Sequence, residues 1–287
     1  MKRQSFFDVG KCETKGSVFE HMKMANYHTH TARCKHAINT DEEYVLAAIE
    51  AGYDCLGFAD HTPWPYEDGF VSGVRMDVAQ LDEYIASIRG LKEKYSGKID
   101  IRVGLECEYY PAYLDWLEKT TEQKHIQYLI LGSHHNLTDN GGFYFGASTE
   151  PEHIRLYTQR TVAAMRTGMF AYLAHPDLVM RGYPVFDSAC RDMAYELCQT
   201  ANEMHMPLEY NLMGNEYKKQ KNSPWKGAGY PDDHFWQIAA EMKCTAIIGL
   251  DSHKAEHVRH GEDYHAAEKY LDNLGINRVS EIPMRCE

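Results

Sequence analysis

The chain has 287 residues, of which 44% are hydrophobic and 25% charged, and its formal net charge is −12. This length suits one large domain or two small ones, and the composition is that of a globular protein. The acidic balance argues against a general nucleic-acid-binding surface, which would be basic. It leaves room for a small phosphorylated substrate, because bound metal ions can reverse the local sign of the field.

The sequence also predicts where the protein works. No apolar run approaches the ~20 residues that span a bilayer, and the first residues lack the apolar segment of a secretory signal. The eight cysteines stand apart, and none forms a C-x-x-C pair, which is the pattern of reduced thiols rather than of a disulfide framework. We therefore expect a cytoplasmic protein with no membrane partner. The sequence carries no signal of its oligomeric state.

Short, mostly apolar runs recur along the chain and predict strands that are buried on both faces, as in a parallel sheet covered by helices. The runs lie at about residues 24–28, 55–59, 101–106, 127–132, 169–174, 207–211 and 245–249.

Helical patterns separate these runs. Thr40 begins a capping box with Glu43, and the helix that follows should stop at Gly52. Asp77 begins a second long segment whose apolar residues fall on one face. The remaining helices are expected near residues 112–124, 150–167, 187–205, 232–243 and 262–273. This sustained alternation predicts an α/β fold that approaches the eight units of a TIM barrel.

No Pro/Ser linker or low-complexity stretch divides the chain. Residues 1–22 are expected to form an N-terminal arm of unknown role, and residues 23–287 a single barrel domain. The longest irregular segments, 62–76, 136–149 and 212–231, all follow strands. We expect them to line the mouth of the barrel and to shape the substrate pocket.

Six of the predicted strands end in histidine, aspartate or glutamate. The residues at these ends are His28 and His30, Asp60 and His61, Glu106, His134 and His135, His175, and Asp251 and His253. Since the carboxyl ends of parallel strands meet at one face of a barrel, these side chains should converge. Imidazoles and carboxylates are ligands of divalent metals, so the pattern predicts a metalloenzyme.

The side-chain directions refine this set. Residues two apart in an extended chain point the same way, so His28 and His30 can reach one ion. His36, on the following loop, is an ordinary solvated histidine unless it joins them. Asp60 is a candidate partner that orients an imidazole.

Two positions leave a choice. A carboxylate at the last position of an apolar strand is costly unless it is paired or metal-bound, which favours Glu106 over Glu108. His134 and His135 are adjacent, so at most one of them should face the metal ions.

The set H-T-H, A-D-H-T-P, G-L-E, L-G-S-x-H, A-H-P-D and G-L-D-S-H resembles the PHP (polymerase and histidinol phosphatase) family, over about residues 24–260. Within that family, the stretches C-K-H-A at 34–37 and L-E-Y-N at 208–211 are most like its histidinol-phosphatase branch. The resemblance implies the PHP fold, a distorted (β/α)7 TIM-like barrel, with three divalent metal ions that are Zn, Fe or Mn.

The resemblance also implies how the ligands divide among the ions. By position, the first ion takes His28, His30, Glu106 and Asp251, the second His36, His61 and His253, and the third Glu106, His135 and His175. Glu106 bridges two ions in this scheme. The family pattern G-S-x-H selects His135 over His134.

The activity implied is that of a phosphomonoesterase that hydrolyses L-histidinol phosphate to L-histidinol and phosphate in histidine biosynthesis. A metal-activated hydroxide would attack the phosphorus, with Glu106 and Asp251 as catalytic residues. The proton for the leaving alkoxide would come from Asp251 or from a histidine of the cluster.

Four further residues are candidates for binding the substrate. Arg181 and Ser252 are expected to meet the phosphate, although Arg181 reads equally well as a surface arginine. Glu209 and Asn211, at alternate positions of one strand, are expected to hold an amine or imidazole of the substrate, with packing as the alternative role for one of them. Cys34 is expected to be a packed neighbour rather than a thiolate ligand.

Other functions fit less well. Phosphotyrosine, nucleotide or sugar phosphates are alternative substrates within the family. An amidohydrolase-type enzyme often places a carbamylated lysine where this chain has G-S-H-H. A nuclease conflicts with the acidic single domain, and a non-catalytic binding module conflicts with the complete ligand set.

Overall fold

The computed structural model describes residues 22–219 and 224–285, so the predicted N-terminal arm lies outside the described residues except for Met22. The strands are β1 Ala25–Asn26, β2 Cys55–His61, β3 Asp100–Cys107, β4 Tyr128–Leu131, β5 Leu208–Asn211, β6 Thr245–Gly249 and β7 Asn277–Arg278. The helices are α1 Asp41–Ala51, α2 Leu81–Lys94, α3 Leu114–Gln123, α4 Pro151–Met165, α5 Ser188–Met204, α6 Leu212–Lys219, α7 Asp233–Glu241, α8 Ala255–Arg259 and α9 Gly261–Leu274.

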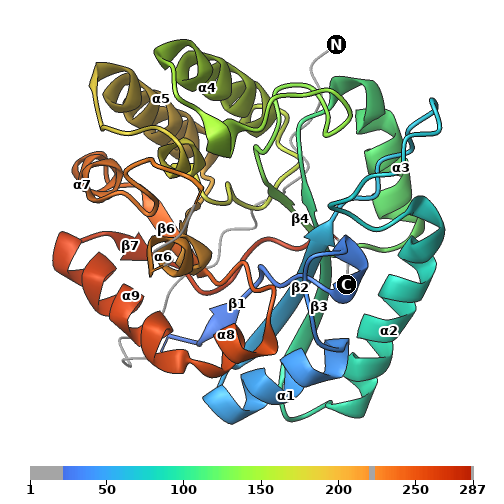
Figure 1. Cartoon of the computed structure of the whole chain (residues 1–287). Helices are drawn as coiled ribbons and strands as arrows, with labels where there is room; N and C mark the ends of the chain where they lie inside the picture. The colour runs from blue at the N-terminus through green and yellow to red at the C-terminus, as the bar shows by residue number, and fades with distance from the viewer. Residues whose placement is uncertain (1–21, 220–223, 286–287) are drawn as a thin grey trace.

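The strands curl into a parallel barrel that the helices surround (Figure 1). One sheet has the order β1-β2-β3-β4 and the other β5-β6-β7, and the strands within each sheet pair in parallel. A parallel bridge between Thr29 and Ser252 brings the chain beyond β1 beside the chain beyond β6. The α/β class and the TIM-like barrel predicted from the sequence are confirmed.

The segment predicted as a strand at 169–174 joins the two sheets but is not a regular strand. Leu173 forms isolated parallel bridges to Leu131 on the β4 side and to Leu208 on the β5 side. The Ala171 and Ala174 backbone N–H groups also donate to β4 carbonyls. The prediction was right about the segment's place in the barrel and wrong about its regularity, because it makes single bridges in place of a continuous ladder.

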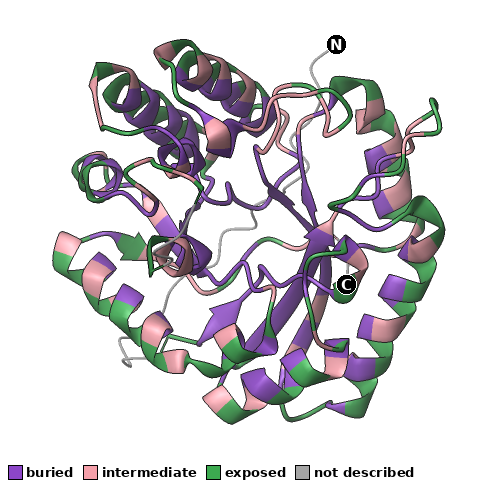
Figure 2. Cartoon of the chain, viewed as in Figure 1, coloured by how far each residue is buried: buried purple, intermediate pink, exposed green. Residues whose placement is uncertain are grey.

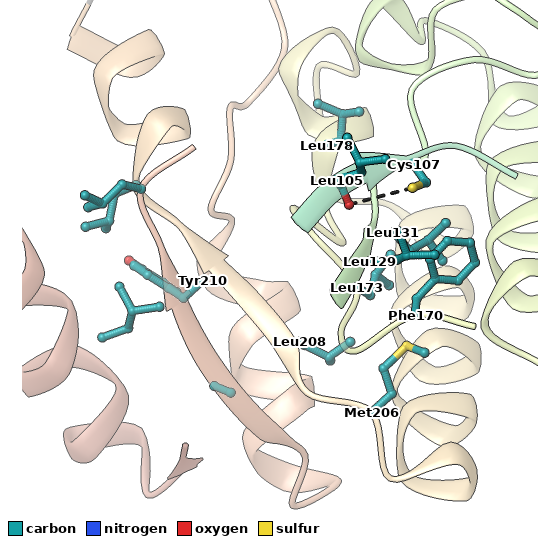
Figure 3. Close-up of a cluster of buried hydrophobic side chains, with 14 of the residues drawn as sticks. Leu105, Cys107, Leu129, Leu131, Phe170, Leu173, Leu178, Met206, Leu208 and Tyr210 are labelled. Atoms are coloured by element: carbon teal, nitrogen blue, oxygen red, sulfur yellow. Dashed lines mark hydrogen bonds between the residues drawn. The ribbon is translucent and has the colours of Figure 1, made fainter. Parts of the chain in front are cut away.

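Two apolar layers follow from the alternation of side chains along these strands. Outward-facing residues pack against the helices, and Figure 3 shows Leu129, Leu131, Leu173 and Leu208 in this layer. Inside the barrel, Tyr128 is fully buried and its hydroxyl donates to the Tyr27 and Phe58 carbonyls at 2.8 and 3.0 Å. The two layers leave the carboxyl ends of the strands for polar side chains.

Glycines make the room that Tyr128 needs. A Cβ at Gly57 on β2 or at Gly104 on β3 would collide with the Tyr128 side chain. The packed interior is a plug rather than a pore, as in other barrels of this class.

The helices follow their predicted signals. Thr40 and Glu43 form the capping box of α1, and Gly52 ends it in the left-handed conformation with φ of 83°. The apolar stripe of α2 faces inward while its polar face is exposed (Figure 2). α6 and α8 were not predicted, and α6 occupies part of the segment 212–231 that was expected to be irregular. No helix within the described ranges is long and apolar enough to cross a membrane.

Candidate metal centre

The register of the sheet brings the predicted ligands together. His61 at the end of β2 is the Cα partner of Glu106 on β3, and Glu106 is in turn the partner of Ile130 on β4. The chain just beyond β1 carries His28 and His30, which reach the same point. We call His28, His30, Glu106 and His175 the floor of the cluster, since their side chains are at most 1% exposed.

Glu106 lies at the centre of the cluster. Its Oε1 is 3.0 Å from His175 Nε2, and its Oε2 is 3.4 Å from His28 Nε2 and 3.0 Å from His61 Nδ1. A Cβ at Gly132 would collide with Glu106 Oε1, so glycine is needed to let this carboxylate turn inward.

Asp251 closes the cluster from the end of β6. Its Oδ1 lies 3.1 Å from His30 Nε2 and 3.5 Å from His28 Nε2. Asp251 and His175 both have positive φ angles, 49° and 30°. Non-glycine residues in such conformations cluster at functional sites, where the surrounding structure holds them.

His36, His61 and His253 form the open end of the cluster, which we call the rim. The His36 residue is exposed, and the side chains of His61 and His253 are 12% and 14% exposed. His36 Nε2 lies 2.9 Å from His253 Nε2, and these three histidines form one of the groups able to hold a metal ion.

The residues present fit divalent metal ions. His28 Nε2, His30 Nε2 and Glu106 Oε2 are buried and have no hydrogen-bond partner, although buried polar atoms nearly always have one. Ligand atoms around a tetrahedral ion at about 2.1 Å lie about 3.4 Å apart, and Asp251 Oδ1 lies 3.1 Å from His30 Nε2 and 3.5 Å from His28 Nε2. Donors so arranged face a common centre rather than one another.

Charge also favours metal binding. Burial alone would raise the pKa of Glu106 and of Asp251, yet the surrounding imidazoles hold the pKa of both carboxyls well below the usual range. Burial lowers the pKa of His61 to about 3. Burial alone would also lower the pKa of His30, but Asp251 and Asp60 raise it to about 9, so a metal ion would replace a proton there. Ionised carboxylates and neutral imidazoles are the forms that bind metals.

Three buried carboxylates hold the rings of the cluster from behind. His28 Nδ1 lies 2.8 Å from Glu209 Oε1, His30 Nδ1 lies 3.3 Å from Asp60 Oδ1, and His134 Nδ1 lies 3.0 Å from Glu108 Oε1. Such contacts fix the ring orientation and make the opposite nitrogen a stronger ligand. The expected role of Asp60 as an orienting partner agrees with this geometry.

The structure places His134, and not the predicted His135, against the cluster. His134 Nε2 lies 3.2 Å from Glu106 Oε1. The His135 ring packs beside Tyr144 instead, with centroids 5.5 Å apart, and its Nδ1 has no partner. β4 ends at Leu131, and His134 N–H donates to the Gly132 carbonyl in a turn, so the alternation of an extended strand does not apply there.

Glu209, Asn211 and Ser252 do not face the substrate space as predicted. Glu209 is fully buried, and besides His28 it accepts from the His175 backbone N–H at 3.1 Å and from Asn211 Nδ2 at 2.8 Å. Ser252 Oγ donates to the Lys254 carbonyl at 2.8 Å. Alternation correctly turned Glu209 inward, but the side chain lies beneath the ligands rather than above them.

A cavity of about 370 Å³ opens above the cluster, and Arg181 lines it together with His134, His175 and Asp251. The volume falls in the range of small-molecule sites. All three irregular segments that were expected to shape the pocket contribute to its lining, with Arg75, Tyr144 and Tyr217 among their residues.

The two arginines of the cavity differ in their partners. Arg75 is buried and is paired with Glu108 at 2.9 Å and with Asp139 at 3.2 Å. Arg181 donates to the Tyr144 hydroxyl at 2.8 Å and lies over the Tyr217 ring at 4.0 Å. Within the described ranges Arg181 has no carboxylate partner.

Sequence reasoning missed the network behind His134. Glu108 accepts from Arg75 and from Trp64 Nε1 at 2.8 Å, and it holds His134. Glu108 was considered only as a rival ligand, and Arg75 lies on a loop with no motif of its own. The one available signal was the spacing of Glu108, two residues beyond Glu106, which turns both side chains toward the inside of the barrel.

The cysteines agree with the expected reduced thiols. Those that the structure describes are all buried and unpaired: Cys34, Cys55, Cys107, Cys190, Cys198 and Cys244. Burial raises the pKa of the Cys34 thiol, and Cys34 lies with His30 and His253 in one of the groups able to hold a metal ion.

Known proteins resemble this chain in sequence and in fold. "Probable histidinol-phosphatase" of Deinococcus radiodurans is 29% identical over 274 residues, which cover 90% of this chain and 96% of that protein. "Histidinol-phosphatase" of Bacillus subtilis is 25% identical over 277 residues, which cover 88% of this chain and 99% of that protein.

The solved structure of a histidinol phosphate phosphatase from Lactococcus lactis, complexed with Zn, L-histidinol and phosphate, matches with a TM-score of 0.68 and 18% identity. The match covers 91% of this chain and 99% of that one. Residues 26–212 match the PHP domain. With its strand-end donors and its parallel barrel, the chain belongs to the PHP domain family.

Proposed function

We propose that this protein is a metal-dependent phosphomonoesterase that hydrolyses L-histidinol phosphate to L-histidinol and phosphate. The observation that carries the proposal is one shared cavity, in which the histidine and carboxylate cluster and the guanidinium of Arg181 face the same space. The names of the relatives and the ligands of the Lactococcus lactis structure support the choice of substrate.

The donor set supports three divalent ions. We assign His28, His30, Glu106 and Asp251 to the first, the rim histidines His36, His61 and His253 to the second, and Glu106, His134 and His175 to the third. His134 takes the place that the family pattern assigns to His135. Imidazole and carboxylate donors suit Zn, Fe or Mn, and the Lactococcus lactis structure makes zinc the first ion to test. Such ions, when bound, lower the pKa of a bound water and stabilise charge on phosphoryl oxygens.

Arg181 binds the phosphate in this proposal. A guanidinium without a carboxylate partner, at the wall of a cavity, recognises phosphate oxygens through charge-assisted hydrogen bonds. The Tyr144 hydroxyl and the Tyr217 ring hold it in place. Arg75 is neutralised by Glu108 and Asp139, so its role is to hold Glu108 behind His134.

Hydrolysis forms a bond from the water oxygen to phosphorus and breaks the bond from phosphorus to the ester oxygen. The water loses a proton, and the leaving alkoxide gains one. Of the two cluster carboxylates, Asp251 lines the cavity and Glu106 does not. We therefore propose that the ionised Asp251 carboxylate takes the proton from the water and passes it to the leaving alkoxide, and that Glu106 holds the central ligand position.

Glu209 and Asn211 position these groups. Glu209 fixes the ring of His28 and the backbone of His175, while Asn211 Nδ2 donates to Glu209 and, at 3.3 Å, to Asp251 Oδ2. A Cβ at Gly249 on the neighbouring strand would collide with Glu209 Oε1. The proposed ligands His28, His175 and Asp251, from three separate parts of the barrel, are thus all held by Glu209 or by its partner Asn211.

A phosphate-release screen tests the proposed substrate. The full chain would be loaded with Zn, Mn or Fe and compared on L-histidinol phosphate, phosphotyrosine, a nucleotide monophosphate and a sugar phosphate. We expect kcat/KM for L-histidinol phosphate to exceed the others by about tenfold or more. Equal rates on all of them would contradict L-histidinol phosphate as the specific substrate but would still agree with a phosphatase. No phosphate release from any of them would overturn the class.

A further inference from the structure

We infer that the rim histidines form an exchangeable metal site, whose ion is held partly by the phosphate group of the bound substrate. This inference rests on the proposed metal centre and goes beyond it, since it ranks the ions by how readily they leave. It divides the cluster into a permanent floor and a rim that is filled together with substrate.

The donors differ in charge between the two ends. The rim group of His36, His61 and His253 contains imidazoles alone, whereas the groups around His28 include Asp251 or Glu106. A divalent ion among neutral donors keeps its full charge, whereas a carboxylate donor offsets part of it and attracts the ion strongly at short range. Two cluster carboxylates approach the rim, and both meet Nδ1 of a ring: Glu106 Oε2 lies 3.0 Å from His61 Nδ1, and Asp251 Oδ1 lies 3.5 Å from His253 Nδ1. For His253 this is the ring edge turned away from His36.

The groups behind the rings differ in the same sense. His28 and His30 each have a buried carboxylate at Nδ1. At the rim, His36 Nδ1 lies 2.8 Å from the Cys34 carbonyl, and His253 Nδ1 lies 2.9 Å from the Asp251 carbonyl. A neutral carbonyl raises the basicity of a ring less than a carboxylate does, so the rim imidazoles are the weaker ligands.

His61 connects the two ends. Its Nδ1 lies 3.0 Å from Glu106 Oε2 in the floor, which leaves the opposite nitrogen, Nε2, for the rim. Its ring centroid lies 5.4 Å from that of His36 and 6.2 Å from that of His253. A neutral imidazole has one lone pair, so His61 adds one neutral donor to the rim and no charge.

The rim also faces the phosphate-binding wall. His36, His61 and His253 line the same cavity as Arg181. Three protein ligands leave a fourth position of a tetrahedral ion open, as in catalytic zinc sites. A phosphate oxygen supplies the anionic ligand that the rim lacks. By linkage, phosphate that binds the rim ion must tighten that ion by the same factor by which the ion tightens phosphate.

Metal release measured with a chromophoric chelator tests this inference without using activity. The zinc-loaded full chain should lose its ions in two phases, and the fast phase should amount to about one ion per chain. Inorganic phosphate should slow that phase by about tenfold or more, whereas sulfate at equal ionic strength should slow it less. The slow phase should be unchanged.

Two variants locate the fast phase. His36→Ala should bind about one ion fewer and lack the fast phase, while remaining folded by circular dichroism. His265→Ala, which removes an exposed histidine paired with Glu268, should release metal as the parent does. A single release phase, a fast phase that survives in His36→Ala, or a fast phase that phosphate does not slow would each overturn the inference.

The outcome is separable from that of the proposed function. Two-phase release that responds to phosphate, in a protein that hydrolyses none of the tested esters, would support the rim site and reject the function. Hydrolysis with single-phase release would do the reverse. A chain that binds no metal under any loading condition would reject both.

Discussion

The floor and the rim of the cluster use the same side chains in opposite surroundings. The floor histidines are buried and meet Glu106, and carboxylates hold His28 and His30 from behind. The rim histidines are more accessible, and backbone carbonyls rather than carboxylates hold His36 and His253. Residue type makes a site capable of binding metal, and we expect burial and the groups behind the ligands to set how firmly it binds.

The largest expected effect comes from breaking the floor. His28→Ala removes a ligand that contacts both Glu106 and Asp251, so kcat should fall by about a thousandfold or more because several kcal/mol of transition-state stabilisation are lost. Metal analysis should show fewer ions per chain, with His265→Ala as the matched control. Full activity in His28→Ala would contradict the site.

A pair of neighbouring substitutions tests which strand-four histidine belongs to the floor. His134→Ala should lose bound metal and most of the activity, because His134, although outside the floor as defined, faces the floor residue Glu106. His135→Ala should keep the metal content of the parent. The number of metal ions per chain, measured for both proteins after dialysis, distinguishes the two histidines. Metal loss in His135→Ala and not in His134→Ala would make His135 the ligand, as the sequence pattern predicts.

Removing the charge behind the floor should have a smaller effect. Glu209→Gln keeps the size of the side chain. Its amide nitrogen cannot accept the hydrogen bonds that a carboxylate oxygen of Glu209 accepts from His28, His175 or Asn211. We expect metal binding to weaken by about 10- to 100-fold, and high metal concentrations should restore kcat. Glu203→Gln, at an exposed site on α5, is the control. If Glu209 served only the fold, the melting temperature would drop while the metal affinity of the folded protein stayed the same.

The smallest expected effect concerns the wall above the rim. Arg181→Met should lower kcat/KM by about 10- to 100-fold, mostly through KM, because it removes a charged hydrogen-bond donor worth about 1.5–3 kcal/mol. Arg181→Lys should recover part of the loss. Steady-state kinetics and phosphate inhibition measure both, and unchanged inhibition by phosphate would place Arg181 outside the binding site.

The sequence revealed the barrel and most of the cluster because both depend on local pattern. Strand-end positions such as His61 and Glu106 follow from apolar runs and from the rule that parallel strands end together. The capping box at Thr40 and the stop at Gly52 are equally local, and the structure has them as predicted.

The remaining features depend on contacts between distant segments. His134 and His135 lie beyond the end of β4, where the chain turns and alternation no longer tells which ring faces inward. Alternation placed Glu209 on the inner face but could not give its depth beneath His28. The ion pair of Arg75 with Glu108 joins a loop to a strand end 33 residues away, and no local pattern marks it.

Metal-dependent phosphate release from L-histidinol phosphate tests the central claim most directly. The full chain would be stripped of metal with a chelator and then titrated with zinc while phosphate release is followed. We predict no hydrolysis by the stripped protein and a rise in rate that saturates at about three equivalents per chain. Hydrolysis that persists at the full rate after every ion has been removed would contradict the account.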